Sequence, residues 1–251
     1  MTTKATIGEI VTTDYRAAGV LDTFGIDFCR TGKKTLEEVC GEQHLDELML
    51  EKALTDLNNS PGHQNPHWNF SDWDTRFLVE FIVHTHHNYI RESMPELLRL
   101  GKIVSGAPGP KHAAMQEVLI LIQKFEGELK RHLEVEEQAM FPYILDMESV
   151  RDHAIAFVEP KFGRVESPIR QLENQHELAV NVLQEIRTLT GDYIPPAGAW
   201  PEHRTWYVLL KEFDADMHLH LHLENNILFP RALALEAELL ACKGFTTIWF
   251  G

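Results

Sequence analysis

Two stretches of the sequence, 132–142 and 220–230, align with each other without a gap. Each begins with a histidine, carries a glutamate four residues later and ends with a Phe-Pro pair. On a helix, residues four positions apart lie on the same face, so each stretch would direct one imidazole and one carboxylate to a common point. Imidazole and carboxylate are ligands of transition-metal ions, and the repeat therefore indicates metal binding.

A single histidine precedes each stretch by a similar distance. His176 lies 44 residues before His220, and His87 lies 45 residues before His132. His84 lies one turn before His87 on the same expected face. It would either contact a ligand without binding the metal itself, or be the ligand in place of His87. The histidines and glutamates would then come from two helix pairs that are related by a pseudo-two-fold axis.

The expected ligand set is too large for one metal ion. It consists of His87, His132, Glu136, His176, His220 and Glu224. Two ions share this set well, because each can take two histidines while both glutamates bridge the ions. Mixed imidazole and carboxylate ligation favours iron, with manganese as the alternative, over structural zinc, which prefers thiolates. One His-x-x-x-Glu pair alone is usually a solvated surface pair, so the prediction depends on the repetition.

Four long amphipathic patterns would position these residues. They cover about 72–103, 112–145, 167–190 and 202–238, and they predict an all-α fold with an antiparallel four-helix bundle over 72–238. Pro95 is expected to kink the first helix or to divide it. The Phe-Pro pairs are expected to cap a helix turn and pack the core, and His218 and His222 to line a neighbouring surface.

The remaining segments predict a small domain and two connections. A small helical N-terminal domain is expected over 1–60, and a C-terminal tail over 239–251. The segment 61–71 is rich in Asn, Pro, Gly and His, and we expect a linker that ends in a helix N-cap at Ser71 or Asp72.

The composition narrows the classes of partner. The chain carries 38 acidic and 23 basic residues, a formal net charge of −15, which disfavours nucleic acid and anionic membrane surfaces. Its three cysteines do not make a disulfide framework, and neither a secretory signal nor a membrane-spanning segment is expected. The predicted location is a reducing cytoplasm.

These motifs resemble a known family. The stretch 132–142, the run Glu173-Asn174-Gln175-His176, the run 223–233 and the region that follows His87 are similar to the ligand-bearing helices of hemerythrin-like di-iron proteins, specifically the repair of iron centres group. The segments 7–10, 24–29 and 32–36 resemble the small ScdA-like domain that precedes the bundle in that group. The resemblance implies the same six ligands and two non-haem iron ions, which an oxo bridge can join.

One residue departs from the family pattern. The family has two adjacent cysteines in the N-terminal domain, whereas here Cys29 is followed by Arg30. A role that needs a pair of neighbouring thiols is therefore in doubt. Cys29 could still act alone as a redox or iron-relay thiolate, which the nearby Arg30, Lys33 and Lys34 would favour, or it could be a small buried hydrophobic residue.

The function that the resemblance implies is repair of iron–sulfur clusters damaged by nitrosative or oxidative stress. The chain would be an iron donor and a nitric oxide-reactive centre, with iron–sulfur proteins as clients. The first alternative is an enzyme that reduces nitric oxide or peroxide, and the second is a carrier or sensor of oxygen or nitric oxide, which the missing fifth histidine ligand disfavours. No catalytic residue is assigned, and the N-terminal domain is a candidate contact for a client or for a second copy in a homodimer.

Overall fold

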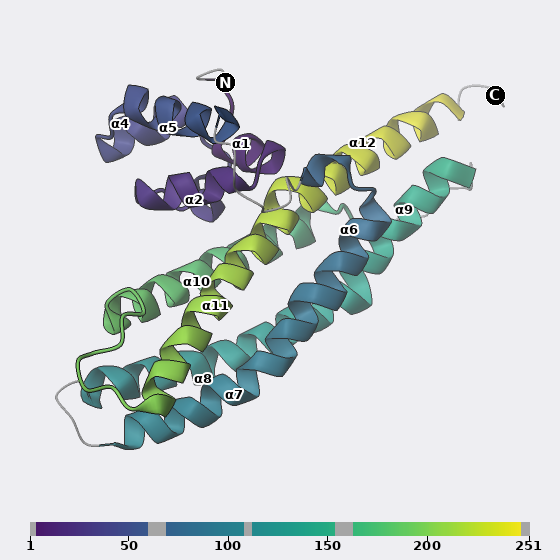
Figure 1. Ribbon diagram of the computed structural model, residues 1–251. Coiled ribbons are helices and arrows are strands. Elements are labelled where there is room, and N and C mark those ends of the chain that lie inside the picture. The colour runs from purple at the N-terminus through teal and green to yellow at the C-terminus, as the bar shows by residue number, and fades with distance from the viewer. Residues whose placement is uncertain (1–3, 60–68, 108–111, 154–162, 247–251) are drawn as a thin grey trace. The chain divides into compact units, whose positions relative to one another are not determined.

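The computed structural model describes residues 4–59, 69–107, 112–153 and 163–246. The chain divides into two compact units, one formed by 1–78 with 221–231 and the other by 79–220 with 232–251. Helices make up both units, and the described ranges contain a single isolated bridge, between Thr6 and Thr35, and no strand (Figure 1). The predicted all-α class is confirmed.

Five short helices at the N-terminus supply most of the first unit. They are α1 (Ile7–Thr13), α2 (Arg16–Thr23), α3 (Phe28–Thr31), α4 (Leu36–Gln43) and α5 (Glu47–Asn59). Thr6 and Thr35 each form a capping box, in which the threonine hydroxyl and a glutamate three residues later satisfy the first amides of α1 and α4. Their apolar faces share one core, in which Ile7, Leu21 and Leu50 are fully buried. These residues form short helices because strong caps and a shared core compensate for their small length.

The N-terminal helices pack closely against the segment 221–231 of the same unit. Gly8 N–H donates to the carbonyl of Gly32 at 2.9 Å. A Cβ atom on Gly8 would lie 2.7 Å from Oδ1 of Asn226, and one on Gly32 would lie 2.4 Å from it. The side chain of Asn226 therefore occupies the space that two glycines leave open, and only glycine fits there without a shift.

We expect Gly32→Ala to destabilise the protein by about 1–3 kcal/mol, the usual cost of overpacking a filled site. The added methyl group meets Asn226, while the backbone of Gly32 (φ −53°) suits alanine. Urea unfolding of the full chain measures the change. The control is Gly41→Ala inside α4, where nothing lies within 4 Å and alanine should stabilise the helix by up to about 1 kcal/mol.

Addition of Asn226→Ala to Gly32→Ala removes the group with which the methyl collides. The double variant should therefore lose less stability than the sum of the two single variants. Strict additivity would contradict the proposed packing of Asn226 against Gly32.

Long helices form the second unit and run side by side, with neighbours antiparallel (Figure 1). In chain order the helices from α6 onward are α6 (Thr75–Phe81), α7 (Asn88–Gly106), α8 (His112–Val135), α9 (Phe141–His153), α10 (Glu166–Thr190), α11 (Pro201–Leu223) and α12 (Phe229–Thr246). Trp206 Nε1–H of α11 donates to the carbonyl of Leu97 in α7 at 2.9 Å, and Arg187 of α10 pairs with Asp214 of α11. These contacts join α11 to helices on both sides.

The core of the bundle follows a three-four spacing. In α8 the buried residues include Met115, Val118, Ile122, Phe125, Leu129 and His132, and Glu136 continues the same spacing at the start of the next turn. In α11 they include Trp206, Leu210, Phe213, Met217 and His220. Such spacing keeps one stripe of each helix facing its neighbours. The predicted metal ligands continue the apolar stripes, so the helices that bury the core also place the ligands inside it.

Three π-helical turns interrupt the described long helices at predicted ligands: η2 (Ile82–His87), η3 (Glu136–Met140) and η4 (Glu224–Leu228). The amide of Phe141 donates to the carbonyl of Glu136, and that of Phe229 to Glu224, each five residues back. The proline that follows each phenylalanine has no N–H for a regular bond four residues back, which favours wider spacing here. Turns of this kind are frequent at functional sites.

Several predicted boundaries differ from the structure. The Phe-Pro pairs do not cap a helix turn, because the helix continues through them to His153 and to Thr246. Their packing role is confirmed, since Phe141 and Phe229 are buried. Pro95 lies inside α7 without dividing it. A short 3₁₀ turn, η1 (Phe70–Asp72), occupies the expected N-cap position, and the carboxylate of Asp74 accepts the Phe77 amide at the start of α6.

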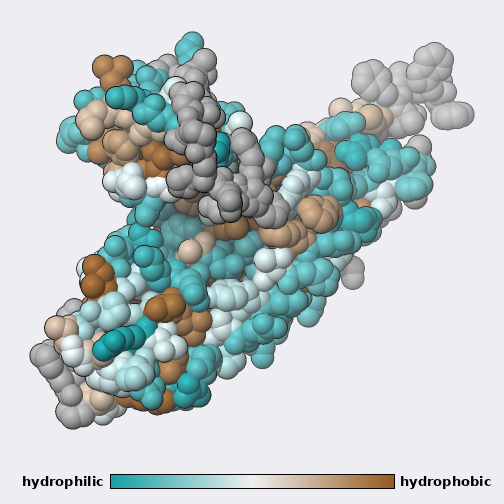
Figure 2. Space-filling model, viewed as in Figure 1, coloured by the Kyte–Doolittle hydropathy of each residue, from teal (hydrophilic) through white to brown (hydrophobic). Residues whose placement is uncertain are grey.

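Some predictions fall outside the described residues. They concern the last residue of the predicted N-terminal domain, most of the linker, 61–68, and the last residues of the tail, 247–251. Among the helices that the structure describes, none is both long and apolar enough to cross a membrane. The visible face of the long helices is mainly hydrophilic, as expected for a strongly acidic chain (Figure 2).

Candidate metal centre

Five of the six predicted ligands come together in the core of the second unit. Nε2 of His87 lies 3.2 Å from Nε2 of His220, and Nε2 of His132 lies 3.0 Å from Nε2 of His176. The carboxylate of Glu136 is shared by both pairs. All five side chains are at most 6% exposed, so water hardly reaches their ligand atoms.

The two oxygens of Glu136 face different histidines. Oε2 lies 3.4 Å from Nε2 of His87, whereas Oε1 lies 3.1 Å from Nε2 of His132 and 3.8 Å from Nε2 of His176. Glu136 begins the π-helical turn η3, which directs its carboxylate into the core between the helices. One carboxylate can therefore serve two neighbouring positions.

Glu224, the sixth predicted ligand, follows His220 by four residues, directly after the end of α11. It begins the π-helical turn η4 as Glu136 begins η3, and its side chain is fully buried. Residues at this spacing share a helix face. The two copies of the repeat thus have the same local structure, with histidine before and glutamate at the start of a π-helical turn.

The hydrogen bonds of the Nδ1 atoms show that Nε2 is the nitrogen that carries the lone pair at the centre. Nδ1–H of His87 donates to Oε1 of Glu137 at 2.7 Å, and Nδ1–H of His132 donates to Oε1 of Gln175 at 2.7 Å. A neutral imidazole that donates through Nδ1 has a lone pair on Nε2. Lone pairs and a carboxylate that converge in a buried space repel one another unless a cation lies between them. The donor set therefore fits a metal ion.

The outer residue Glu137 is anchored on its other side. Nη2 of Arg91 lies 2.6 Å from Oε1 of Glu137, the oxygen that His87 also reaches. Burial alone would raise the pKa of Glu137, but the hydrogen bonds from His87 and Arg91 outweigh it and hold that pKa below its usual range. Glu137 is consequently a fixed negative charge behind His87.

Regular helical spacing places His84, and not His86, on the same face as His87, but the structure shows the opposite. The side chain of His84 is exposed, while His86 is buried and stacks parallel to His220 with ring centroids 5.7 Å apart. The wider turn of η2 rotates His84 away from the face of His87. Nδ1 of His86 lies 2.8 Å from Oδ1 of Asp216, so a buried, carboxylate-bound ring supports His220. Sequence reasoning assigned no role to His86.

His222 is a second residue whose position sequence reasoning missed. It is buried rather than on a surface, and the rings of Tyr15, Phe28 and Phe70 lie around it with centroids 5.8–6.3 Å away. This burial lowers the pKa of His222 to about 3, so the ring is neutral at physiological pH. Its Nδ1 lies 2.9 Å from Nδ2 of Asn226.

Cys29 is a half-buried residue near the start of α3. Asp27 accepts hydrogen bonds from the amides of Cys29 and Arg30. Lys34 pairs with Glu42 at 2.6 Å, while Arg30 is exposed. The role of Cys29 as a single thiolate stays a prediction.

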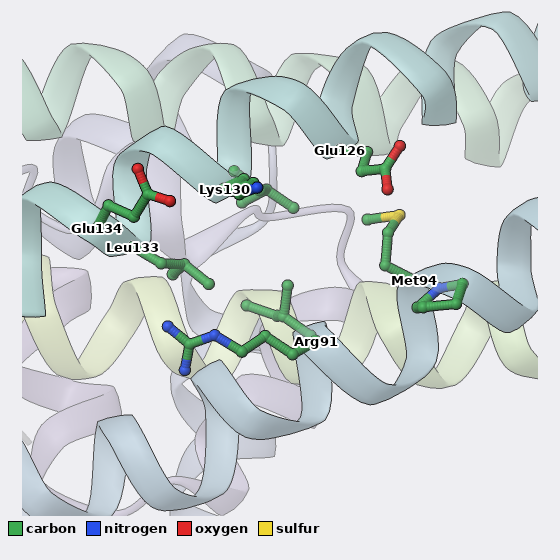
Figure 3. A pocket seen from close by; sticks show the side chains of 9 residues that line it. Arg91, Met94, Glu126, Lys130, Leu133 and Glu134 are labelled. Atoms are coloured by element: carbon green, nitrogen blue, oxygen red, sulfur yellow. The ribbon is translucent and has the colours of Figure 1, made fainter.

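A pocket of about 280 Å³ lies between α7 and α8, next to the ligand-bearing turns. Figure 3 shows its charged side chains, among them Arg91 and Lys130, together with the apolar Leu133 and Met94. Leu133 follows the predicted ligand His132 directly in the chain. Because Arg91 also lines this pocket, the anchor of Glu137 is accessible from solvent.

Comparison with known proteins places these features in a family. Residues 79–232 match the model of the hemerythrin HHE cation binding domain, and residues 3–58 match the ScdA_N domain of unknown function. The iron-sulfur cluster repair protein YtfE of Musicola paradisiaca is 32% identical over 235 residues, 93% of this chain and 98% of that protein.

Two further relatives align over a similar length. A probable iron-sulfur cluster repair protein of Haemophilus influenzae is 33% identical over 230 residues, which cover 90% of this chain and 96% of the relative. The YtfE protein of Edwardsiella ictaluri is 32% identical over 227 residues, with the same coverage. The resemblance that the motifs indicated is confirmed: the chain belongs to the iron–sulfur cluster repair family of hemerythrin-like proteins.

Proposed function

We propose that this chain holds two non-haem iron ions in its bundle core and uses them to repair damaged iron–sulfur clusters in the cytoplasm. Iron–sulfur proteins would be its clients. The relatives described above bear the name of this activity. The matched hemerythrin HHE domain is a cation-binding domain, which agrees with the buried donor set.

The observation that supports a pair of ions best is the position of Glu136. Its two oxygens face the two histidine pairs separately, as a bridging carboxylate requires. Glu224, in the equivalent position of the repeat, would be the second bridge. Imidazole and carboxylate donors without thiolates suit iron, with manganese as the less favoured alternative.

The protein's own residues would hold the metal ions and orient the histidine rings, and they would not react themselves. His87 and His132 keep their Nε2 lone pairs directed inward because Glu137 and Gln175 accept hydrogen bonds from their Nδ1–H groups. The buried apolar residues around the centre exclude water. Iron bound by only these ligands would have open coordination positions for nitric oxide, oxygen or peroxide, and it could leave without breaking a thiolate cage.

The test is repair of a purified [4Fe–4S] dehydratase that nitric oxide has inactivated. We expect the anaerobic, iron-loaded protein to restore dehydratase activity in the presence of a thiol reductant, while the metal-free protein does not. An equal amount of free ferrous iron, with and without a chelator, controls for iron that has simply dissociated. If the protein instead forms nitrous oxide over many turnovers and the dehydratase does not recover, the chain is a nitric oxide reductase and not a repair protein.

A further inference from the structure

The pocket between α7 and α8 has the features of a second binding site, separate from the metal ligands. Its volume of about 280 Å³ lies just below the range of about 300–1,000 Å³ that drug-sized ligands occupy, so it suits a smaller molecule. Apolar and charged side chains line it together, and the buried apolar ones are Ile90, Met94, Leu129 and Leu133. Pockets of this kind bury the body of a ligand and orient it through a few polar groups.

The charged side chains of the pocket balance one another. Two are cations and two are carboxylates: Arg91, Lys130, Glu126 and Glu134. In the described part of the chain, the charged groups of Lys130 and of both glutamates form no hydrogen bond or ion pair. A purely anionic ligand would meet the two carboxylates, and a purely cationic one would meet the two cations. The pocket therefore suits a small molecule that carries both charges.

Arg91 and Glu134 lie toward the same end of the pocket and come from opposite helices (Figure 3). Nη2 of Arg91 donates to Oε1 of Glu137, which follows Glu134 by three residues, and this bond holds the guanidinium in place. Within the described ranges, the guanidinium forms no other hydrogen bond. A guanidinium has several N–H donors, so Arg91 can bind a second carboxylate without releasing Glu137.

The apolar part of the pocket extends away from this charged end. Met94 follows Arg91 by one turn of α7 and lies, together with Glu126, at the far end (Figure 3). Leu129 precedes Glu134 on α8, and the two helices are antiparallel, so the apolar surfaces of both helices continue in the same direction. A ligand with two opposite charges at one end and an apolar tail at the other would match this arrangement.

We propose that this pocket binds a free amino acid with an apolar side chain. The α-carboxylate would accept hydrogen bonds from Arg91, the α-ammonium group would donate to Glu134, and the side chain would pack on Met94 and Leu129. A free amino acid carries both charged groups on the same carbon atom, whereas a peptide separates its terminal charges along its length. None of these pocket residues belongs to the predicted metal ligands, so the proposal does not depend on the proposed function.

The experiment is an NMR titration of the purified full-length protein with L-leucine. We expect a Kd on the order of 0.1–1 mM, which is ordinary for so small a ligand. Three analogues each lack one recognised feature: 4-methylpentanoate has no ammonium group, 3-methylbutylamine has no carboxylate and glycine has no side chain. Each should bind at least about 10-fold more weakly than leucine, because a charged hydrogen bond or the burial of the apolar side chain is lost.

A substitution locates the binding in this pocket. Glu134→Gln should weaken leucine binding by about 10-fold, because the ammonium group loses its charged acceptor. The same variant should leave the weak binding of 4-methylpentanoate unchanged, since that analogue has no ammonium group. Glu128→Gln, which changes an exposed glutamate of α8 outside the pocket lining, is the matched control and should not alter the binding of either ligand.

Three results would overturn the proposal. The first is no leucine binding at about ten times the expected Kd. The second is 4-methylpentanoate or glycine bound as tightly as leucine, and the third is an equal effect of Glu134→Gln and Glu128→Gln. Leucine binding with the expected selectivity would support the amino-acid site whether or not the protein repairs the damaged dehydratase.

Discussion

Glu136→Ala is expected to abolish stable binding of both metal ions. Its oxygens face both histidine pairs, so the substitution removes one ligand from each position at once. Even an outer-shell partner is worth about 10–100-fold in metal affinity, and a shared direct ligand should be worth more. The iron content of anaerobically purified protein should fall from roughly two ions per chain, the stoichiometry of di-iron bundles, to near zero.

Two further variants make this experiment specific. Glu134→Ala changes an exposed carboxylate two residues away, and it should leave the metal content unchanged. Glu224→Ala alters the equivalent residue of the repeat and should reproduce the loss. Iron retained at the wild-type level in Glu136→Ala would refute the bridging assignment. Loss of one ion only would assign Glu136 to a single position.

Arg187→Leu should destabilise the bundle by about 3–5 kcal/mol, the usual cost of leaving a buried charge without its partner. Nη2 of Arg187 lies 2.6 Å from Oδ2 of Asp214, whose side chain is only 3% exposed. His218 contacts the other oxygen at 3.2 Å. Urea unfolding of samples with equal metal content measures the loss, and Arg170→Leu, an exposed arginine on α10, should change stability by less than about 0.5 kcal/mol.

The pH dependence of this pair gives an independent check. Burial alone would raise the pKa of Asp214, but His218 and Arg187 outweigh it and hold that pKa below its usual value. A lowered pKa in the folded state contributes stability above the unfolded pKa, and this contribution is lost as the pH falls through the folded value. The stability gap between wild type and Arg187→Leu should therefore be largest at neutral pH and narrow below about pH 4. A gap independent of pH would show that the loss comes from packing.

The residues that converge at the candidate metal centre could be predicted from sequence because the repeat encodes their spacing locally. His132 and Glu136 share a helix face by spacing alone, and the second copy at His220 supports the same assignment. The choice of His87 over His84 depended on chain distance, because His87 precedes His132 by nearly the same number of residues as His176 precedes His220. The structure places His87 beside His220 and leaves His84 exposed.

The misplaced residues share a physical cause. Helical spacing of 3.6 residues assumes an unbroken ladder of backbone hydrogen bonds, and the three π-helical turns break that assumption at the centre itself. The turn η2 exposes His84 and buries His86. In the sequence, a Phe-Pro pair indicates a helix boundary. A buried helix can nevertheless continue through the pair when one turn widens to π-helical spacing.

The remaining surprises come from contacts between residues far apart in the chain. Nothing in the sequence around His222 shows that Tyr15, Phe28 and Phe70 surround it. The fit of Asn226 against Gly32 is likewise invisible until the fold brings them together. Local patterns report the face that a residue occupies, whereas its neighbours depend on tertiary packing.

The grouping of 221–231 with the N-terminal helices has a consequence for cooperativity. Stability in proteins is distributed over units that open together, and such units follow compact packing rather than chain order. The helical turn that carries Glu224 would then open and close with α1 and α3, although roughly 190 to 210 residues of chain separate them.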